Sequence, residues 1–193
     1  MKKNILTRRN FIEMGLIGSG SVLLLPQCTN LSNISVWRFF TDKEALLVNV
    51  IIEQIIPTDE WPGARDAGVA NFIDKQLVGP YTRYQEDYRN GLAAINLSCI
   101  NLYKNQFEAL EWEEQTGFLK RMEAGELSTL QSKEDSEKTW AEVSDREFFN
   151  LIRDHTMQGF YGSPRHGGNR NYVSYRMIEL DYPLIIGQNR YEK

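Results

Sequence analysis

Histidine and cysteine, the residue types that most often carry metal or nucleophilic chemistry, are scarce in this chain of 193 residues. The chain has two histidines, His155 and His166, and two cysteines, Cys28 and Cys99. Two cysteines are too few for an iron–sulfur cluster, which needs about four thiolates, and the two histidines do not share the close helical spacing of a zinc-binding pair. Neither a Cys-x-x-Cys-His haem motif nor a Gly-x-Ser-x-Gly nucleophile motif is present. The sequence therefore gives no reason to expect independent catalysis.

One alternative stays open at this point, a free-standing exported lipoprotein or enzyme with its own ligand or metal site near His155 and His166. Each histidine also has a structural interpretation. His155 falls on a predicted helix, where it would be a hydrogen-bonded side chain, and His166 falls in a loop or an interface. Cys99 falls in an apolar helical stripe, where a free cysteine is expected as a small buried hydrophobe.

Residues 159–172 mix Gly, Pro, Asn, Arg and aromatic side chains without a helical or strand period. Gly167-Gly168 permits positive φ angles and a close backbone approach, and Asn169 can stabilise a turn. Arg165 and Arg170 offer forked donors to carbonyl or carboxylate oxygens. The segment is either a structural loop that holds the C-terminus against the helices or a partner-binding surface, with a ligand pocket as a third alternative. We predict contact or loop-stabilising roles for Phe160, Tyr161, Arg165, His166, Gly167, Gly168, Asn169, Arg170 and Tyr172.

The first 27 residues are typical of an export signal. Four basic side chains and one acidic one give them a net charge of +3, whereas the other 166 residues carry −7. The apolar stretch Met14–Leu25 is shorter than the ~20 residues that a membrane-spanning helix needs. Arg8 and Arg9 followed by Phe11 resemble a twin-arginine signal, and an ordinary Sec signal or a short amphipathic anchor is the alternative. We expect a periplasmic protein that associates with the membrane through its complex or a lipid anchor.

Cys28 follows the apolar stretch directly, where a lipoprotein signal places its lipidated cysteine. Pro26 and Gln27 depart from the small residues that usually precede such a cysteine. Lipidation of Cys28 and cleavage nearby that leaves an unmodified thiol both stay open. If Cys28 is lipidated or removed, Cys99 is the single thiol of the mature chain.

Helical periodicity and helix-boundary residues dominate the rest of the sequence. Capping boxes at Thr41–Glu44 and Ser144–Glu147 predict two helix starts, and Pro57 predicts a helix end. No segment shows the alternation of a strand. Helices are expected at about 41–56, 69–77, 81–103, 108–124 and 144–158. The apolar stripe of the third comprises Tyr84, Tyr88, Leu92, Ile95, Cys99 and Leu102.

These elements predict an all-α fold, a compact bundle of about five helices with an irregular Gly/Asn/Arg/Tyr-rich C-terminal segment. We expect a twin-arginine-type signal peptide at 1–27, a linker at 28–40 and a single helical domain at 41–193. Trp37 and the pair Phe39-Phe40 should dock on the domain, and Trp140 should anchor a long polar loop.

The overall composition narrows the class of protein. Aromatic residues make up 11% of the chain, which argues against intrinsic disorder. The net charge is −4, and no basic cluster lies beyond the N-terminus, which argues against a nucleic-acid partner.

Four sequence blocks, taken in order, carry a family resemblance. They are Ile51–Asp59, Pro62–Val69 with Phe72–Asp74, Tyr88–Leu92, and His155–Tyr161 leading into Gly167–Arg170. With the twin-arginine signal they resemble the gluconate 2-dehydrogenase subunit 3 family, the small subunits of membrane-associated flavin dehydrogenases. The stretch Met177–Pro183 departs from that pattern, because it lacks both glycines of the Ile-Gly-Tyr-Pro-Gly turn that the family commonly carries there.

The resemblance implies an accessory subunit without catalytic, cofactor-binding or metal-binding residues of its own. A large subunit would bind FAD and oxidise a sugar or sugar acid, and a c-type cytochrome with haem c is a further candidate partner. This chain would assist assembly and accompany the large subunit through the twin-arginine translocase. The substrate of the large subunit stays open: gluconate, glucose, another sugar, or a glycoside that is oxidised at position 3. An accessory subunit should also leave an apolar or aromatic patch exposed when isolated.

Overall fold

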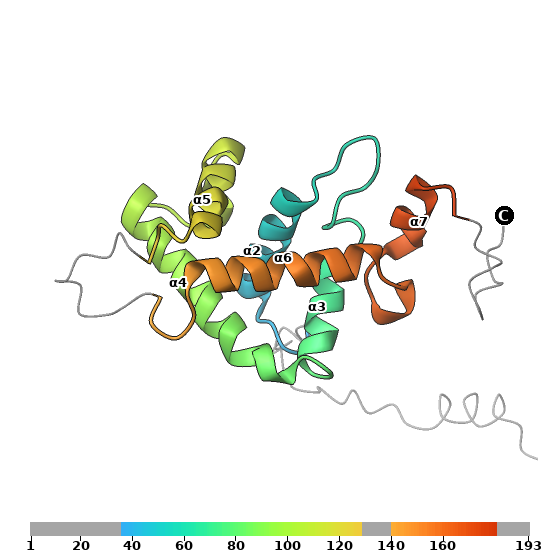
Figure 1. Cartoon of the computed structure of the whole chain (residues 1–193), viewed down its shortest axis with the longest axis horizontal. Coiled ribbons are helices and arrows are strands. Elements are labelled where there is room, and N and C mark those ends of the chain that lie inside the picture. The colour runs from blue at the N-terminus through green and yellow to red at the C-terminus, as the bar shows by residue number, and fades with distance from the viewer. Residues whose placement is uncertain (1–35, 129–139, 181–193) are drawn as a thin grey trace, which may run out of the picture. The chain divides into compact units, whose positions relative to one another are not determined.

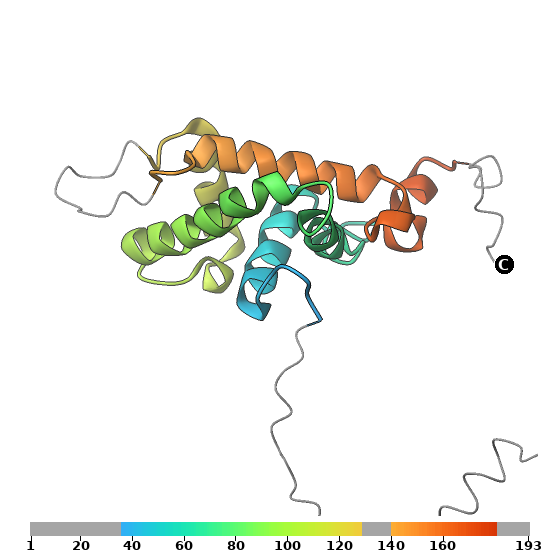
Figure 2. The same cartoon turned by 90° about the horizontal axis from the view of Figure 1, so that it is seen from below.

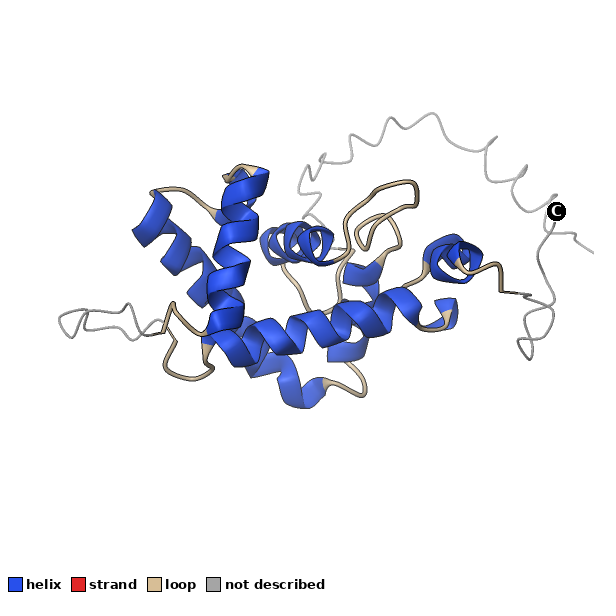
Figure 3. Cartoon of the chain, turned by 45° about the horizontal axis from the view of Figure 1, so that its top comes forward, coloured by secondary structure: helices blue, strands red, loops and turns tan. Residues whose placement is uncertain are grey.

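The computed structural model describes residues 36–128 and 140–180, which belong to one compact unit of the chain. This part contains six α-helices and no strand, which confirms the all-α prediction (Figure 3). The helices are α2 (Asp42–Ile55), α3 (Val69–Leu77), α4 (Gln85–Tyr103), α5 (Trp112–Ala124), α6 (Asp145–Tyr161) and α7 (Val173–Met177). Short 3₁₀ turns lie at Thr82–Tyr84 (η1), Phe107–Ala109 (η2), Pro164–His166 (η3) and Arg170–Tyr172 (η4).

The predicted export signal lies outside the described residues, and so do Arg8, Arg9, Phe11 and Cys28. Within 36–128 and 140–180, no helix combines the length and the apolar character needed to cross a bilayer.

Side-chain caps begin three of the helices. The Thr41 hydroxyl accepts from the Glu44 backbone N–H at 3.3 Å, and the Ser144 hydroxyl accepts from the Glu147 backbone N–H at 3.2 Å, which confirms both predicted capping boxes. A third box, between Glu111 and Glu114, begins α5. The sequence pattern missed it because Glu111 stands where Ser or Thr is usual.

Helices α2 and α6 form the centre of the unit. Helix α6 contacts all five other described α-helices, and Figure 2 shows it lying along one side of α2, α3 and α4. The buried side chains of α2 include Leu47, Val48 and Ile51, each at most 1% exposed. This arrangement confirms that the strongly apolar first helix is central.

Helices α4 and α6 approach each other closely at Gly91. A Cβ atom at this position would lie only 2.4 Å from the ring of Phe148 on α6. Tyr88 and Ile95, from the predicted stripe of α4, are fully buried, but Leu102 is 42% exposed. The prediction for Leu102 is wrong because helical spacing sets the direction of a side chain and not whether another element covers it.

The segment before α2 is held by a buried carboxylate. Asp74 on α3, 3% exposed, accepts hydrogen bonds from the backbone N–H groups of Arg38, Phe39 and Phe40 at 2.8 to 3.0 Å. The Arg89 guanidinium lies 4.0 Å from the centroid of the Phe39 ring and donates to the Phe39 carbonyl at 2.6 Å. These contacts confirm that the Phe39-Phe40 pair docks on the helices.

The predicted anchor at Trp140 is also confirmed. Its indole N–H donates to the Ser98 hydroxyl at 3.0 Å, and the side chain is 7% exposed. Nearby, the Asp145 carboxylate accepts from the backbone N–H of Leu127 at 2.7 Å. Residues 129–139 lie outside the described part. The residues on either side of them are bonded to the helices, Leu127 to α6 and Trp140 to α4.

The described part of the C-terminal segment contains more helix than the sequence predicts. Helix α6 continues to Tyr161, and η3, η4 and α7 follow it (Figure 1). Non-glycine residues at positive φ interrupt these short elements: Asn169 precedes η4, Asn171 lies inside it, and Tyr172 is its last residue, directly before α7. Hydrophobic periodicity does not predict these elements because each is too short for an apolar position to recur.

Candidate functional site

The Gly-Gly pair of the predicted segment packs against the end of α6. Gly167 has a φ of +106°, a conformation that favours glycine. A Cβ atom on Gly168 would lie 2.2 Å from the carbonyl oxygen of Gly159, so only glycine allows this backbone contact. Gly159 in turn faces α3, where its Cβ atom would meet the Phe72 ring at 2.8 Å.

Asn169 ties the segment together from inside. The side chain is fully buried, its amide nitrogen donates to the Gly162 carbonyl at 2.9 Å, and its amide oxygen accepts from the Ser174 backbone N–H at 3.0 Å. The backbone N–H of Arg170 donates to the Ala67 carbonyl at 2.9 Å. One asparagine thus joins the end of α6 to the start of α7, and its neighbour joins both to the loop before α3.

The Arg170 side chain covers a glycine of that loop. Gly68 has a φ of +74°, and a Cβ atom there would lie 3.2 Å from a guanidinium nitrogen of Arg170. Arg170 is exposed on its other side. The residue therefore both supports the loop and presents positive charge at the surface.

The nine residues predicted in this segment lie in two different environments. Phe160, Gly168 and Asn169 are buried within the unit, where they can stabilise the loop but not touch a partner. Gly167 and Tyr172 are half-buried. The exposed members, which a partner could contact, are Tyr161, Arg165, His166 and Arg170.

His155 on α6 is 3% exposed. Three tyrosine rings surround its imidazole: Tyr81, Tyr84 and Tyr88. The Tyr88 hydroxyl lies 3.0 Å from Nδ1 of His155, and the Tyr81 ring stacks on the imidazole with 4.3 Å between centroids. Burial, opposed by the Asp154 carboxylate and assisted by Arg83, lowers the pKa of His155 to about 4. The imidazole is therefore neutral at pH 7 and serves as a buried hydrogen-bond partner.

The two histidines of the alternative interpretation have different surroundings. His155 is enclosed by Tyr81 just before η1, Tyr84 in η1 and Tyr88 on α4, whereas His166 is exposed on η3. Among the residues that the structure describes, no group of three or more His, Cys, Asp or Glu side chains could hold a metal ion. The geometry thus gives the proposed ligand site near His155 and His166 no support.

Cys99 is fully buried, as predicted for a small hydrophobic residue of the α4 stripe. Burial, with Glu108 adding to it, raises the pKa of its thiol to about 12. The thiolate that nucleophilic or metal chemistry requires is therefore absent at neutral pH.

Sequence blocks that lie far apart in the chain meet in space. The block Tyr88–Leu92 contacts α6 through the Tyr88–His155 hydrogen bond. The block Gly167–Arg170 contacts Pro62–Val69 through the Arg170–Ala67 backbone hydrogen bond. The first two blocks meet where the Arg65 backbone N–H donates to the Glu53 carboxylate at 3.3 Å and the Ala64 backbone N–H donates to the Ile56 carbonyl at 2.8 Å. The four blocks that carry the family resemblance are thus joined by one connected set of contacts.

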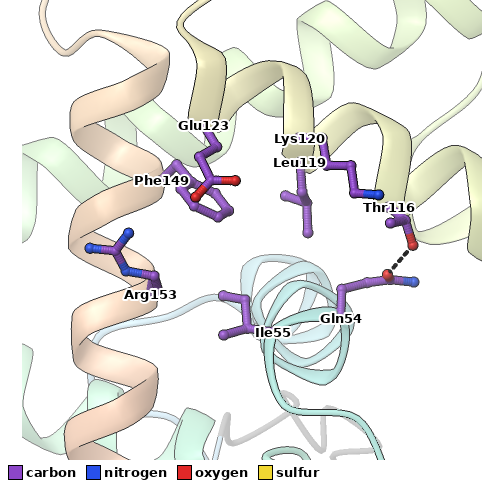
Figure 4. Close-up of a pocket in the computed structure, with 8 residues that line it drawn as sticks. All are labelled: Gln54, Ile55, Thr116, Leu119, Lys120, Glu123, Phe149 and Arg153. Atoms are coloured by element: carbon purple, nitrogen blue, oxygen red, sulfur yellow. Dashed lines mark hydrogen bonds between the residues drawn. The ribbon is translucent and has the colours of Figure 1, made fainter.

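A separate pocket of about 260 Å³ lies between α2, α5 and α6 (Figure 4). Its apolar lining comes from Ile55, Leu119 and Phe149, and charged groups come from Lys120, Glu123 and Arg153. The other two lining residues, Gln54 and Thr116, bond to each other, with 2.7 Å between hydroxyl and amide oxygens. None of the predicted site residues lines this pocket.

Several surface residues at the end of α6 were missed by the sequence analysis. Met177, Ile178 and Leu180, on and after α7, are exposed by 37%, 69% and 40%. The Arg176 guanidinium lies 5.5 Å from the centroid of the Trp61 ring, across a sequence distance that no local pattern spans. A five-residue helix is too short to show an amphipathic period, so only the apolar run Met177-Ile178 could have drawn attention to this region.

Comparison with known proteins gives one match. The family model described as gluconate 2-dehydrogenase subunit 3 matches residues 42–181, which include every described helix. No curated protein and no solved structure matches the chain significantly.

Proposed function

This chain belongs to the gluconate 2-dehydrogenase subunit 3 family, and from that premise we propose that it is a non-catalytic subunit that assembles with and stabilises a flavin-dependent sugar or sugar-acid dehydrogenase. Membership of a subunit family implies a catalytic partner. The observation that carries the proposal is the match across residues 42–181, whose four resembling blocks form one connected set of contacts.

We place the FAD in the partner and not in this chain. A dinucleotide site of the common type needs a glycine-rich turn between a strand and a helix, and the described residues contain no strand. The glycines of the C-terminal segment serve another purpose, since Gly168 and Gly159 allow backbone and ring contacts inside the unit. The oxidised sugar and any haem c of a cytochrome partner would likewise be bound outside this chain.

The proposal includes a role in export. Arg8, Arg9 and Phe11 resemble a twin-arginine signal, and that route carries proteins that are already folded. We propose that the two subunits assemble in the cytoplasm and pass the twin-arginine translocase together, which would place the complex in the periplasm. Lipidation of Cys28 would then hold it at the membrane.

The proposal is tested by purifying the affinity-tagged chain from its native host and recording the absorption spectrum of the eluate. We expect a larger protein in near-stoichiometric amount, together with the absorption bands of oxidised flavin. Mass spectrometry of the larger protein would then identify the dehydrogenase and its substrate class. A colourless, monodisperse monomer would contradict the proposal.

A further inference from the structure

Exposed apolar side chains are concentrated at the C-terminal end of α6 and on α7. The described part of the chain has twelve large hydrophobic residues that are exposed, and five of them fall in residues 157–180. These five are Met157, Tyr161, Met177, Ile178 and Leu180. The segment makes up less than a fifth of the described residues, so its share of exposed apolar side chains is more than twice what an even distribution would give.

The backbone under these side chains is held in costly conformations. Of the five non-glycine residues at positive φ in the described part, four lie in this segment: Asn169, Asn171, Tyr172 and Glu179. Such conformations persist where the surroundings impose them, and they gather at binding sites. Here the buried Asn169 side chain and the Gly168–Gly159 contact hold the backbone around Asn169, Asn171 and Tyr172. This part of the segment is therefore positioned before a partner arrives, which lowers the entropy cost of binding.

The charge of this end differs from that of the segment that forms α4 and α5. Residues 157–180 contain three arginines and one acidic residue, Glu179, whereas residues 85–128 contain eight acidic and four basic side chains. Arg176 is steadied by the Trp61 ring. The loop around Trp61 also carries two acidic residues, Asp59 and Glu60, so the positive charge of this region is confined to η3, η4 and α7. Apolar contact must therefore supply most of the binding free energy.

From these three observations we propose that the FAD-carrying dehydrogenase subunit binds the α7 surface, defined as Tyr161, Arg165, Arg176, Met177, Ile178 and Leu180. The inference rests on the proposed function and adds the place and the chemistry of the contact. The partner presents an apolar patch that covers the side chains after Arg176, bordered by carboxylates that pair with the guanidinium groups. The guanidinium groups orient the partner, and the apolar centre holds it.

The test compares two double variants of the tagged full chain, expressed in the native host. Ile178→Asp with Leu180→Asp places two charges in the centre of the α7 surface. Leu97→Asp with Ile100→Asp is the matched control on α4, because these side chains are exposed by 38% and 44%. We expect the first variant to retain about a tenth or less of the flavoprotein that the wild type retains, since charges in an interface centre are strongly unfavourable. The control variant should retain all of it.

Thermal unfolding of both purified variants ensures that a loss of binding is not a loss of fold. Equal unfolding temperatures with loss only in the α7 variant support the inference. Full retention of the flavoprotein by the α7 variant, or loss only in the α4 control, would overturn the α7 surface while leaving the proposed function intact. A wild-type chain that retains no flavoprotein would overturn the proposed function and this inference together.

Discussion

At the scale of single residues, Gly168 is the most constrained position of the C-terminal segment. A Cβ atom would lie 2.2 Å from the Gly159 carbonyl oxygen, and two hydrogen bonds of the adjacent Asn169 side chain hold the segment in place. We expect Gly168→Ala to lower the free energy of unfolding by about 3 kcal/mol, the cost of overpacking a rigid site. Chemical denaturation of the purified chain measures this change.

Gly117 provides the matched control. It lies inside α5, and a Cβ atom there would meet no other atom within 4 Å. Gly117→Ala should therefore raise the free energy of unfolding by about 0.5–1 kcal/mol, because alanine restricts the unfolded chain and favours the helix. Equal effects of the two substitutions would show that the close contact at Gly168 is absent in solution.

A second residue-scale prediction concerns His155 and pH. Its pKa is about 4 in the folded chain, whereas an unperturbed histidine titrates near 6.5. Between these values the unfolded chain binds more protons than the folded chain, so stability is fully present above pH 6.5 and falls as the pH drops toward 4. The loss attributable to His155 should be about 3 kcal/mol at most.

The measurement is the free energy of unfolding between pH 4 and pH 7 for the wild type and for His155→Gln. Glutamine can still bond to the Tyr88 hydroxyl but does not titrate. The slope of the free energy of unfolding against pH should be smaller in the variant, by the contribution of about one bound proton over this range. An unchanged slope would assign the acid sensitivity to other groups.

At the scale of elements, Asp74 joins α3 to the segment that leads into α2. Its buried carboxylate accepts three backbone hydrogen bonds from residues 38–40. Asp74→Ala should release this segment and lower the free energy of unfolding by about 2–4 kcal/mol, because three N–H donors lose their partner at once. Limited proteolysis should then cut near Phe39, where the wild type resists.

Glu142→Ala is the control for this experiment, since Glu142 is an exposed carboxylate. It should leave the protease resistance unchanged. Resistance retained in Asp74→Ala would mean that Phe40, which is buried, and the Arg89 contact to Phe39 suffice to dock the segment.

At the scale of the whole molecule, the export proposal can be tested apart from the fold. Arg8→Lys with Arg9→Lys keeps the positive charge of the N-terminus but removes the arginine pair. We expect the chain and its flavoprotein partner to stay in the cytoplasm, as measured by cell fractionation and flavin fluorescence. Lys2→Arg with Lys3→Arg is the control that leaves the pair intact and should export normally. Periplasmic flavoprotein in the first variant would contradict a twin-arginine signal.

The sequence by itself determined five of the six described helices and the family. Periodicity and capping side chains are local properties, so Thr41–Glu44 and Ser144–Glu147 located the starts of α2 and α6, and Pro57 located the end of α2 to within two residues. The four blocks pointed to the family, because residue types and their order can be compared without knowing which blocks meet in space.

Only the tertiary structure decided which predicted residues are available to a partner. Phe160 and Asn169 belong to the same segment as Tyr161 and Arg165, yet the first two are buried and the last two are exposed. Burial depends on which elements lie opposite a side chain, and such elements can be distant in sequence: the loop before α3 bonds to this segment at Arg170, about a hundred positions away. The same reason hid the α7 surface, since its residues come from α6, η3 and α7 and from the positions after α7, and the contact between α6 and α7 exists only in the folded chain.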